Sequence, residues 1–140
     1  EGAYLNGRRL RVSVAGGLLE ALLVTGFPYD MHQQGGDLVE LFGTFLGRAR
    51  AVRRLGSAAL DLCYVAAGRF EAFWEQHLKP WDVAAGALVV AEAGGRITGM
   101  DGGAFDARAG LPVASNGLVA ADMLDVIRDS PAGRTLDRTH

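Results

Sequence analysis

The sequence predicts an α/β fold in which a mixed β-sheet is flanked by helices. Segments with the pattern of buried strands alternate along the chain with segments of helical periodicity. The 20 glycines are scattered rather than repeated, which is typical of many tight boundaries between elements. A chain of 140 residues is long enough for one domain with a real core and too short for two ordinary ones.

A hairpin is predicted for residues 1–16. The dipeptide Asn6-Gly7 is a strong turn signal, and it precedes a segment from Leu10 to Val14 in which apolar and basic side chains alternate. We expect that segment to be a strand. Because a two-stranded hairpin is barely stable alone, we expect residues 1–16 to belong to a larger sheet, most of which lies in a preceding part of the protein.

The α/β domain itself is predicted for residues 17–130. Strands are expected at residues 21–25, 51–55, 70–75, 96–98 and 111–115, and helices at 37–48, 58–67 and 80–93 and from Asn116 to Ile127. Ser57 is placed to cap the helix that begins at residue 58. A polar loop is expected from Asp30 to Gly36, and residues 131–140 show no packing pattern, so we expect a flexible tail there.

The helix that begins at Pro80 combines a clear start with a clear end. Proline is tolerated in the first helical turn, and Gly94-Gly95 supplies the residue that ends the helix. Between them nearly every side chain is small and apolar, so we expect the helix to be buried, with Trp81 packed against the sheet. Asp82 is the exception. It either offsets the helix dipole, as acids in first turns commonly do, or it faces a cleft and binds a cation.

Composition narrows the class of protein. The chain carries 14 basic and 16 acidic residues, a balance that predicts neither nucleic-acid nor membrane binding. No apolar run approaches the ~20 residues of a membrane span, and no signal-peptide pattern is present, so we expect a cytoplasmic protein. The single Cys63 excludes an internal disulfide and is expected to be a buried thiol, and the three histidines form no zinc-binding pair.

Trp81 to Gly95 closely resembles the second signature of the inositol monophosphatase family, the magnesium-dependent sugar and cyclitol phosphatases. Three flanking segments agree with that family in order and spacing: residues 2–7, 54–59 and 115–117. The resemblance extends from residue 1 to about residue 128. It implies the C-terminal portion of the layered fold of these sugar phosphatases.

The family's first signature, which supplies most of the metal ligands, has no counterpart in this sequence. Asp101-Gly102-Gly103 lacks both the proline and the first aspartate of that signature. A two-metal phosphatase needs several carboxylates around its cations, and Asp82 alone cannot provide them. We therefore expect the sequence to be the C-terminal half of such an enzyme, with the N-terminal half as its partner.

The resemblance implies roles for five residues. Asp82 matches the catalytic aspartate that ligates Mg²⁺, and Glu75 matches the position that binds a hydroxyl of the substrate. Gly56, Ser57 and Ala58 match the turn beside the sugar or cyclitol ring. Simpler alternatives remain: Glu75 can be a solvated surface acid and Ser57 only a helix cap. Ser57, Glu75 and Asp82 all fall at strand-to-helix junctions, where sites form in α/β sheets.

The function that follows is hydrolysis of a phosphate monoester by metal-activated water, with inositol monophosphate favoured as substrate and a homodimer implied by the family. Related phosphatases act on fructose 1,6-bisphosphate, histidinol phosphate, 3′-phosphonucleotides or NADP. The alternative from another class is a non-catalytic half-domain that binds a polyol or assembles with a partner chain. The missing first signature motivates that alternative.

Overall fold

The protein is built on a five-stranded mixed sheet. The computed structural model describes residues 1–28 and 35–138. The strands are ordered β4-β3-β5-β7-β6, where β3 pairs in parallel with β4 and β5, and β7 runs antiparallel to β5 and β6. Their bounds are Leu22–Thr25 (β3), Ala51–Arg53 (β4), Ala72–Trp74 (β5), Arg96–Gly99 (β6) and Pro112–Ser115 (β7). The predicted α/β class is confirmed.

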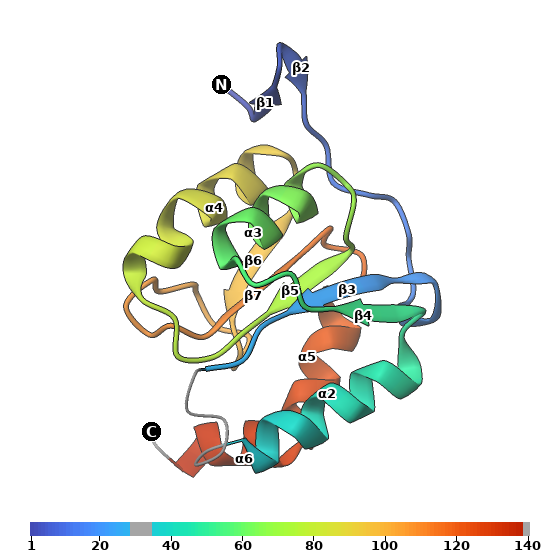
Figure 1. The fold of residues 1–140 in the computed structure, drawn as a ribbon, viewed down its shortest axis with the longest axis vertical. Helices are drawn as coiled ribbons and strands as arrows, with labels where there is room; N and C mark the ends of the chain where they lie inside the picture. Colours follow the sequence, from blue (N-terminus) through green and yellow to red (C-terminus); the bar gives the residue numbers. More distant parts are fainter. Residues whose placement is uncertain (29–34, 139–140) are drawn as a thin grey trace.

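Helices cover both faces of this sheet (Figure 1). Helices α3 (Ala58–Ala66) and α4 (Pro80–Glu92) lie side by side on one face. Helices α2 (Gly36–Arg48), α5 (Ala120–Asp129) and α6 (Pro131–Arg138) lie on the other, and a short 3-10 turn, η1 (Leu18–Glu20), precedes β3. None of the helices in the described part of the chain is long and apolar enough to cross a membrane.

Two hydrophobic clusters, one on each face, hold the layers together. Successive strand residues point to opposite faces, so neighbours in sequence enter different clusters. Leu23 and Trp74 pack with α2 and α5, whereas Val24 and Phe73 pack with α3 and α4. Phe73 is fully buried at the centre of the sheet, which makes β5 buried on both faces rather than alternating in exposure.

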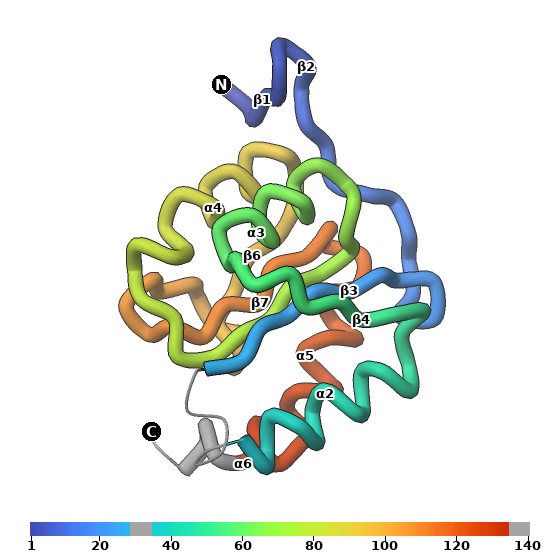
Figure 2. The backbone as a smooth tube through the Cα atoms, viewed as in Figure 1, coloured from blue at the N-terminus to red at the C-terminus, as the bar shows by residue number. Residues whose placement is uncertain are grey.

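The N-terminal hairpin forms a separate two-stranded sheet. Strands β1 (Tyr4–Leu5) and β2 (Arg8–Arg9) pair around the predicted turn, where Asn6 and Gly7 both have positive φ. The predicted strand from Leu10 to Val14 is wrong, because this segment pairs with none of the described strands. It runs down the side of the molecule toward β3 (Figure 2), and the Val12 N–H donates to the Ala93 carbonyl at the end of α4. Membership of residues 1–16 in a larger sheet stays a prediction.

Helix α4 is less buried than its composition suggests. Its Val83, Gly86, Ala87 and Val90 pack inward, but Trp81 is 78% exposed and Leu88 62% exposed. The expectation that Trp81 packs against the sheet is therefore wrong, since it lies on the face of α4 that turns away from α3 and the sheet. Cys63 is half-buried rather than buried.

The C-terminal segment differs from the predicted flexible tail. Residues from Pro131 to Arg138 form α6, and Ala132 is buried against α5 and α2. Ser130 organises this turn, because its hydroxyl donates to the Ile127 carbonyl and accepts from the Gly133 N–H. The last long helix begins at residue 120, later than predicted. Most of the predicted loop from Asp30 to Gly36 lies outside the described residues.

Candidate functional site

The candidate site lies where three parallel strands end and two helices begin. Strands β4, β3 and β5 run in the same direction, so the residues that follow them meet at one edge of the sheet. These are Arg54, Gly26 and Glu75. The N-termini of α3 and α4 follow β4 and β5 in the chain and add Asp61 and Asp82.

Glu75 is the centre of this group. It is half-buried, and burial raises the pKa of its carboxyl to about 7, with the negative charges of Asp61 and Asp82 adding to the effect and Arg54 opposing it. Gly26, which directly follows the neighbouring strand β3, leaves the space that the carboxylate occupies, because a Cβ at position 26 would lie 2.7 Å from Glu75 Cδ. Gly26 is not among the site residues predicted from sequence.

The turn at residues 56–58 is formed by backbone geometry and a helix cap. Gly56 has a φ of +90°, in the left-handed region that favours glycine. The Ser57 hydroxyl accepts a hydrogen bond from the Leu60 N–H at 3.3 Å, which confirms the predicted cap of α3. Gly56 is exposed and both Ser57 and Ala58 are half-buried, so the turn lies at the surface.

Asp82 has the structural role of an acid in a first helical turn. Its Oδ2 accepts a hydrogen bond from the Lys79 N–H at 2.9 Å, which fixes the start of α4. The side chain is half-buried, and its charge reaches Glu75 strongly enough to raise the pKa of that carboxyl. The helix-start interpretation of Asp82 is therefore confirmed, while its role as a metal ligand stays a prediction.

Magnesium does not fit the described residues on their own. Mg²⁺ is held by near-octahedral oxygen ligands, several of them carboxylates in a two-metal phosphatase. Across residues 1–28 and 35–138, no group of three or more Asp, Glu, His or Cys side chains is placed to hold a metal ion. Asp82 could contribute one ligand to a centre whose other ligands come from elsewhere.

Asp61 is a buried acid that is not among the site residues predicted from sequence. It is 1% exposed, and neither carboxylate oxygen has a hydrogen-bond partner among the described residues. Burial raises the pKa of its carboxyl from 3.8 to about 7. A sequence signal existed: Asp61 is the only acid in the otherwise apolar segment from Ala58 to Ala66.

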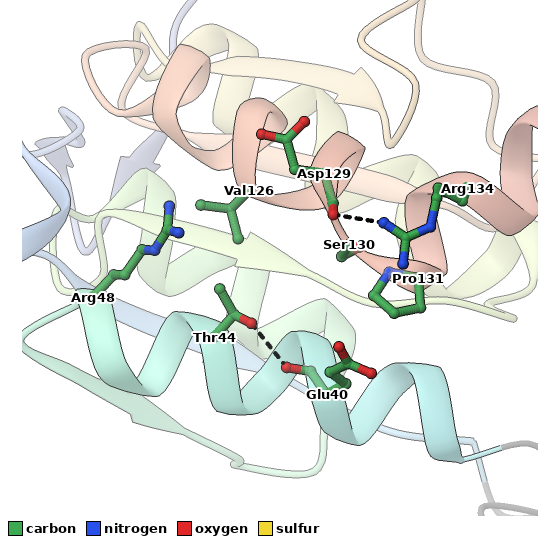
Figure 3. A pocket seen from close by; sticks show the side chains of 8 residues that line it. All are labelled: Glu40, Thr44, Arg48, Val126, Asp129, Ser130, Pro131 and Arg134. Atoms are coloured by element: carbon green, nitrogen blue, oxygen red, sulfur yellow. Dashed lines mark hydrogen bonds between the residues drawn. The ribbon is translucent and has the colours of Figure 1, made fainter.

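A hollow of about 320 Å³ lies away from this group, between α2 on one side and the α5–α6 corner on the other (Figure 3). Arg48 and Arg134 lie at its two ends, and the Arg134 guanidinium donates to the Asp129 carbonyl at 3.0 Å. Because α2, α5 and α6 cover the opposite face of the sheet from α3 and α4, this hollow is separate from the candidate site.

Comparisons with known proteins show the family to which this chain belongs. The inositol monophosphatase family matches residues 1–131, and the chain belongs to that family. The solved structure of inositol monophosphatase from Anabaena (Nostoc) sp. PCC 7120 superposes with a TM-score of 0.89 at 36% identity, covering 96% of this chain and 53% of that one. The predicted family and fold are confirmed.

Two curated relatives carry names from different functional classes. The chain is 46% identical over 128 residues to inositol-1-monophosphatase of Rhizobium meliloti, covering 91% of this chain and 48% of the relative. It is also 46% identical over 129 residues to Nus factor SuhB of Escherichia coli K12, covering 92% of this chain and 48% of the relative. The chain thus spans about half the length of the relatives it matches.

Proposed function

We propose that the intact protein is a magnesium-dependent phosphoric monoester hydrolase that acts on a sugar or cyclitol phosphate, with inositol monophosphate as the first candidate. Family membership and the name of the Rhizobium meliloti relative support this class of reaction. The observation that carries the proposal is the convergence of Glu75 and Asp82 at the ends of the parallel strands, beside an exposed glycine turn.

Glu75 is suited to bind a hydroxyl group of the substrate. An ionised carboxylate accepts hydrogen bonds from hydroxyls, and partial burial strengthens such bonds because water competes less. The turn from Gly56 to Ala58 begins three residues after β4, at the same edge of the sheet. Its exposed backbone would line the ring of a polyol bound by Glu75.

Asp82 is proposed as the catalytic aspartate of this chain and as one ligand of Mg²⁺. When bound, magnesium would polarise the phosphate ester and lower the pKa of a water molecule, which supplies the nucleophile. The hydrogen bond from the Lys79 N–H holds Oδ2 in a fixed direction, and Oδ1 accepts none from the described residues. The remaining ligands are proposed to come from the N-terminal half of the protein.

We place the N-terminal half of the protein against the exposed face of α4. One side of this helix is both exposed and apolar. It is formed by Trp81, Ala84, Ala85 and Leu88. Apolar patches of this kind are seldom left in water by soluble proteins. In this arrangement residues 17–130 are the C-terminal α/β domain, and the exposed hairpin of residues 1–16 joins the sheet of the other half.

Two further parts of the proposal rest on the family resemblance and on composition. They are a homodimeric assembly and a cytoplasmic location. Light scattering of the purified protein measures its mass in solution, and a monomer at micromolar concentration would contradict the first.

A second candidate function is non-catalytic assembly with other macromolecules. It is favoured by the similarity to a protein named Nus factor SuhB and by the lack of a three-ligand metal group in the described residues. Turnover discriminates the two functions, because an assembly module does not need the Glu75 and Asp82 carboxylates to be chemically active.

The test is release of inorganic phosphate by the intact protein, with and without magnesium. Inositol monophosphate, fructose 1,6-bisphosphate, histidinol phosphate, a 3′-phosphonucleotide and NADP form the substrate panel. We expect Glu75→Gln to raise KM for the best substrate roughly tenfold, because a charge-assisted hydrogen bond of about 1.5–3 kcal/mol is weakened. Glu92→Gln, a change of the same type at an exposed position of α4, is the control. Absence of magnesium-dependent turnover across the panel would reject the proposal.

A further inference from the structure

Gly26 is a glycine at a position where the backbone does not require one. Its φ lies outside the left-handed region that favours glycine, whereas Gly56 and Gly68 both lie within that region. Glycine loses more conformational freedom on folding than any other residue, so alanine is generally more stable where the backbone suits both. Backbone conformation therefore does not explain the glycine at position 26.

The space beside Gly26 does explain it. The three atoms nearest to a Cβ placed at this position all belong to the carboxyl group of Glu75. Cδ would lie at 2.7 Å and Oε2 at 3.1 Å, with Oε1 closer still, whereas ordinary van der Waals contact begins at 3.4 Å. The carboxyl group of Glu75 thus occupies the volume that any side chain at position 26 would need.

The two strands that carry this contact are tied together directly before it. Thr25 pairs with Trp74, and the next position along the two parallel strands sets Gly26 beside Glu75. The fully buried Thr25 hydroxyl also donates a hydrogen bond to the Trp74 carbonyl. Because the ends of β3 and β5 are held in this way, a new side chain at position 26 would displace the free end of the Glu75 side chain rather than the strands.

Polar partners do not hold the Glu75 carboxyl group in place. Within residues 1–28 and 35–138 it accepts no hydrogen bond and forms no ion pair. Both oxygens are therefore free to accept hydrogen bonds from a bound ligand. The position of the carboxyl group is set by close packing, and the bare backbone of Gly26 is part of that packing.

We propose that Gly26 is a positioning residue of the polyol site, the part of the candidate site formed by Glu75 and the turn from Gly56 to Ala58. The missing side chain lets the Glu75 carboxyl group lie against the end of β3, where it accepts a hydrogen bond from a substrate hydroxyl. This inference rests on the proposed role of Glu75, and Gly26 itself need not touch the substrate.

The size of the expected displacement follows from the packing distances. A Cβ at position 26 would move Glu75 Cδ by at least 0.7 Å, the difference between 2.7 Å and the 3.4 Å of ordinary contact. Hydrogen bonds from hydroxyl donors span roughly 2.5–3.0 Å between heavy atoms, so a shift of this size breaks or seriously weakens one. Gly26→Ala should therefore impair substrate binding through Glu75 alone.

The first experiment measures KM and kcat of intact Gly26→Ala with the best substrate of the panel. We expect KM to rise roughly tenfold, as in Glu75→Gln, and kcat to change less than twofold. Circular dichroism should show a normal fold, because the displaced group is the free end of a side chain. Gly43→Ala, whose Cβ would meet nothing within 4 Å, is the matched control and should leave KM unchanged. An unchanged KM in Gly26→Ala, where Glu75→Gln raises it, would overturn the inference.

A shorter acid at position 75 separates the loss of space from other effects of the alanine. Glu75→Asp removes one methylene and withdraws the carboxyl group from position 26. This substitution raises KM by itself, but adding Gly26→Ala to it should change KM less than twofold. If Gly26→Ala still raises KM tenfold in the Glu75→Asp background, its effect does not pass through the contact with Glu75, and the inference is wrong.

A structural experiment tests the same contact without turnover. High-resolution crystal structures of the intact wild type and of Gly26→Ala, both free of substrate, give the position of the Glu75 carboxyl group. We expect Cδ to move by 0.7 Å or more while the backbones of β3 and β5 stay in place. A carboxyl group that keeps its wild-type position would overturn the inference. A wild-type protein without turnover would reject the proposed function alone, because the displacement is measured independently.

Discussion

Replacing Asp61 by asparagine should stabilise the protein at neutral and alkaline pH. The substitution keeps the shape of the side chain and removes the ionisable group. Asp61 is 1% exposed, and burial raises the pKa of its carboxyl from 3.8 to about 7. The folded state therefore holds the proton more tightly than the unfolded state does.

The sign and size of the effect follow from that difference. Below pH 3.8 the carboxyl is protonated in both states and costs little. As the pH rises from 3.8 to about 7, the unfolded state releases its proton while the folded state retains it, so the wild type loses stability over this interval. The full difference corresponds to up to about 4 kcal/mol. Asparagine has no ionisable group, so the free energy of burying its side chain does not change with pH.

Urea denaturation at a series of pH values from 4 to 8 measures directly how the stability difference between the two proteins depends on pH. We expect the free energy of unfolding of Asp61→Asn to exceed that of the wild type by an amount that grows with pH and levels off near pH 7. Glu92→Gln, which removes an exposed acid, should show no such growth. A stability difference that is constant with pH would refute the reasoning, because it would mean that Asp61 ionises equally in both states.

Further stability predictions concern close packing and capping. Gly86→Ala should destabilise the protein by about 1–3 kcal/mol, because the alanine Cβ would lie 2.7 Å from Leu62 Cβ at the α3–α4 contact. This clash outweighs the better helix propensity of alanine. Thermal unfolding measures the loss of stability. Gly43→Ala, whose Cβ would meet nothing within 4 Å, should instead stabilise by up to about 1 kcal/mol, and a loss would contradict this. Asn116→Ala should cost about 1–2 kcal/mol in urea denaturation, because the Asn116 Oδ1 accepts the Leu118 and Val119 N–H groups before α5; an unchanged midpoint would argue against this cap.

Most of the fold could be predicted from sequence because its signals are local. The Asn6-Gly7 turn, the Ser57 cap and the proline start of α4 each depend on a few adjacent residues. What failed depended on tertiary context. Trp81 is exposed because the described residues cover only one face of α4, and α6 forms because Ser130 caps it.

The site could be predicted only in part. Glu75 and Asp82 were proposed from strand-to-helix junctions and a family resemblance, and their roles stay predictions; in the structure the negative charge of Asp82 adds to the raised pKa of Glu75. Gly26 and Asp61 escaped notice because their roles depend on register between strands and on burial. Position 26 matters only because the pairing of Thr25 with Trp74 sets it beside Glu75.

The most direct measurement of the central claim is magnesium-dependent phosphate release from inositol monophosphate by the intact protein and by Asp82→Asn. If Asp82 is one ligand of a catalytic magnesium centre, we expect the variant to retain its fold by circular dichroism and to lose roughly 100-fold or more in kcat/KM. Wild-type turnover that is unchanged in Asp82→Asn would show that Asp82 only starts a helix, and it would contradict the account.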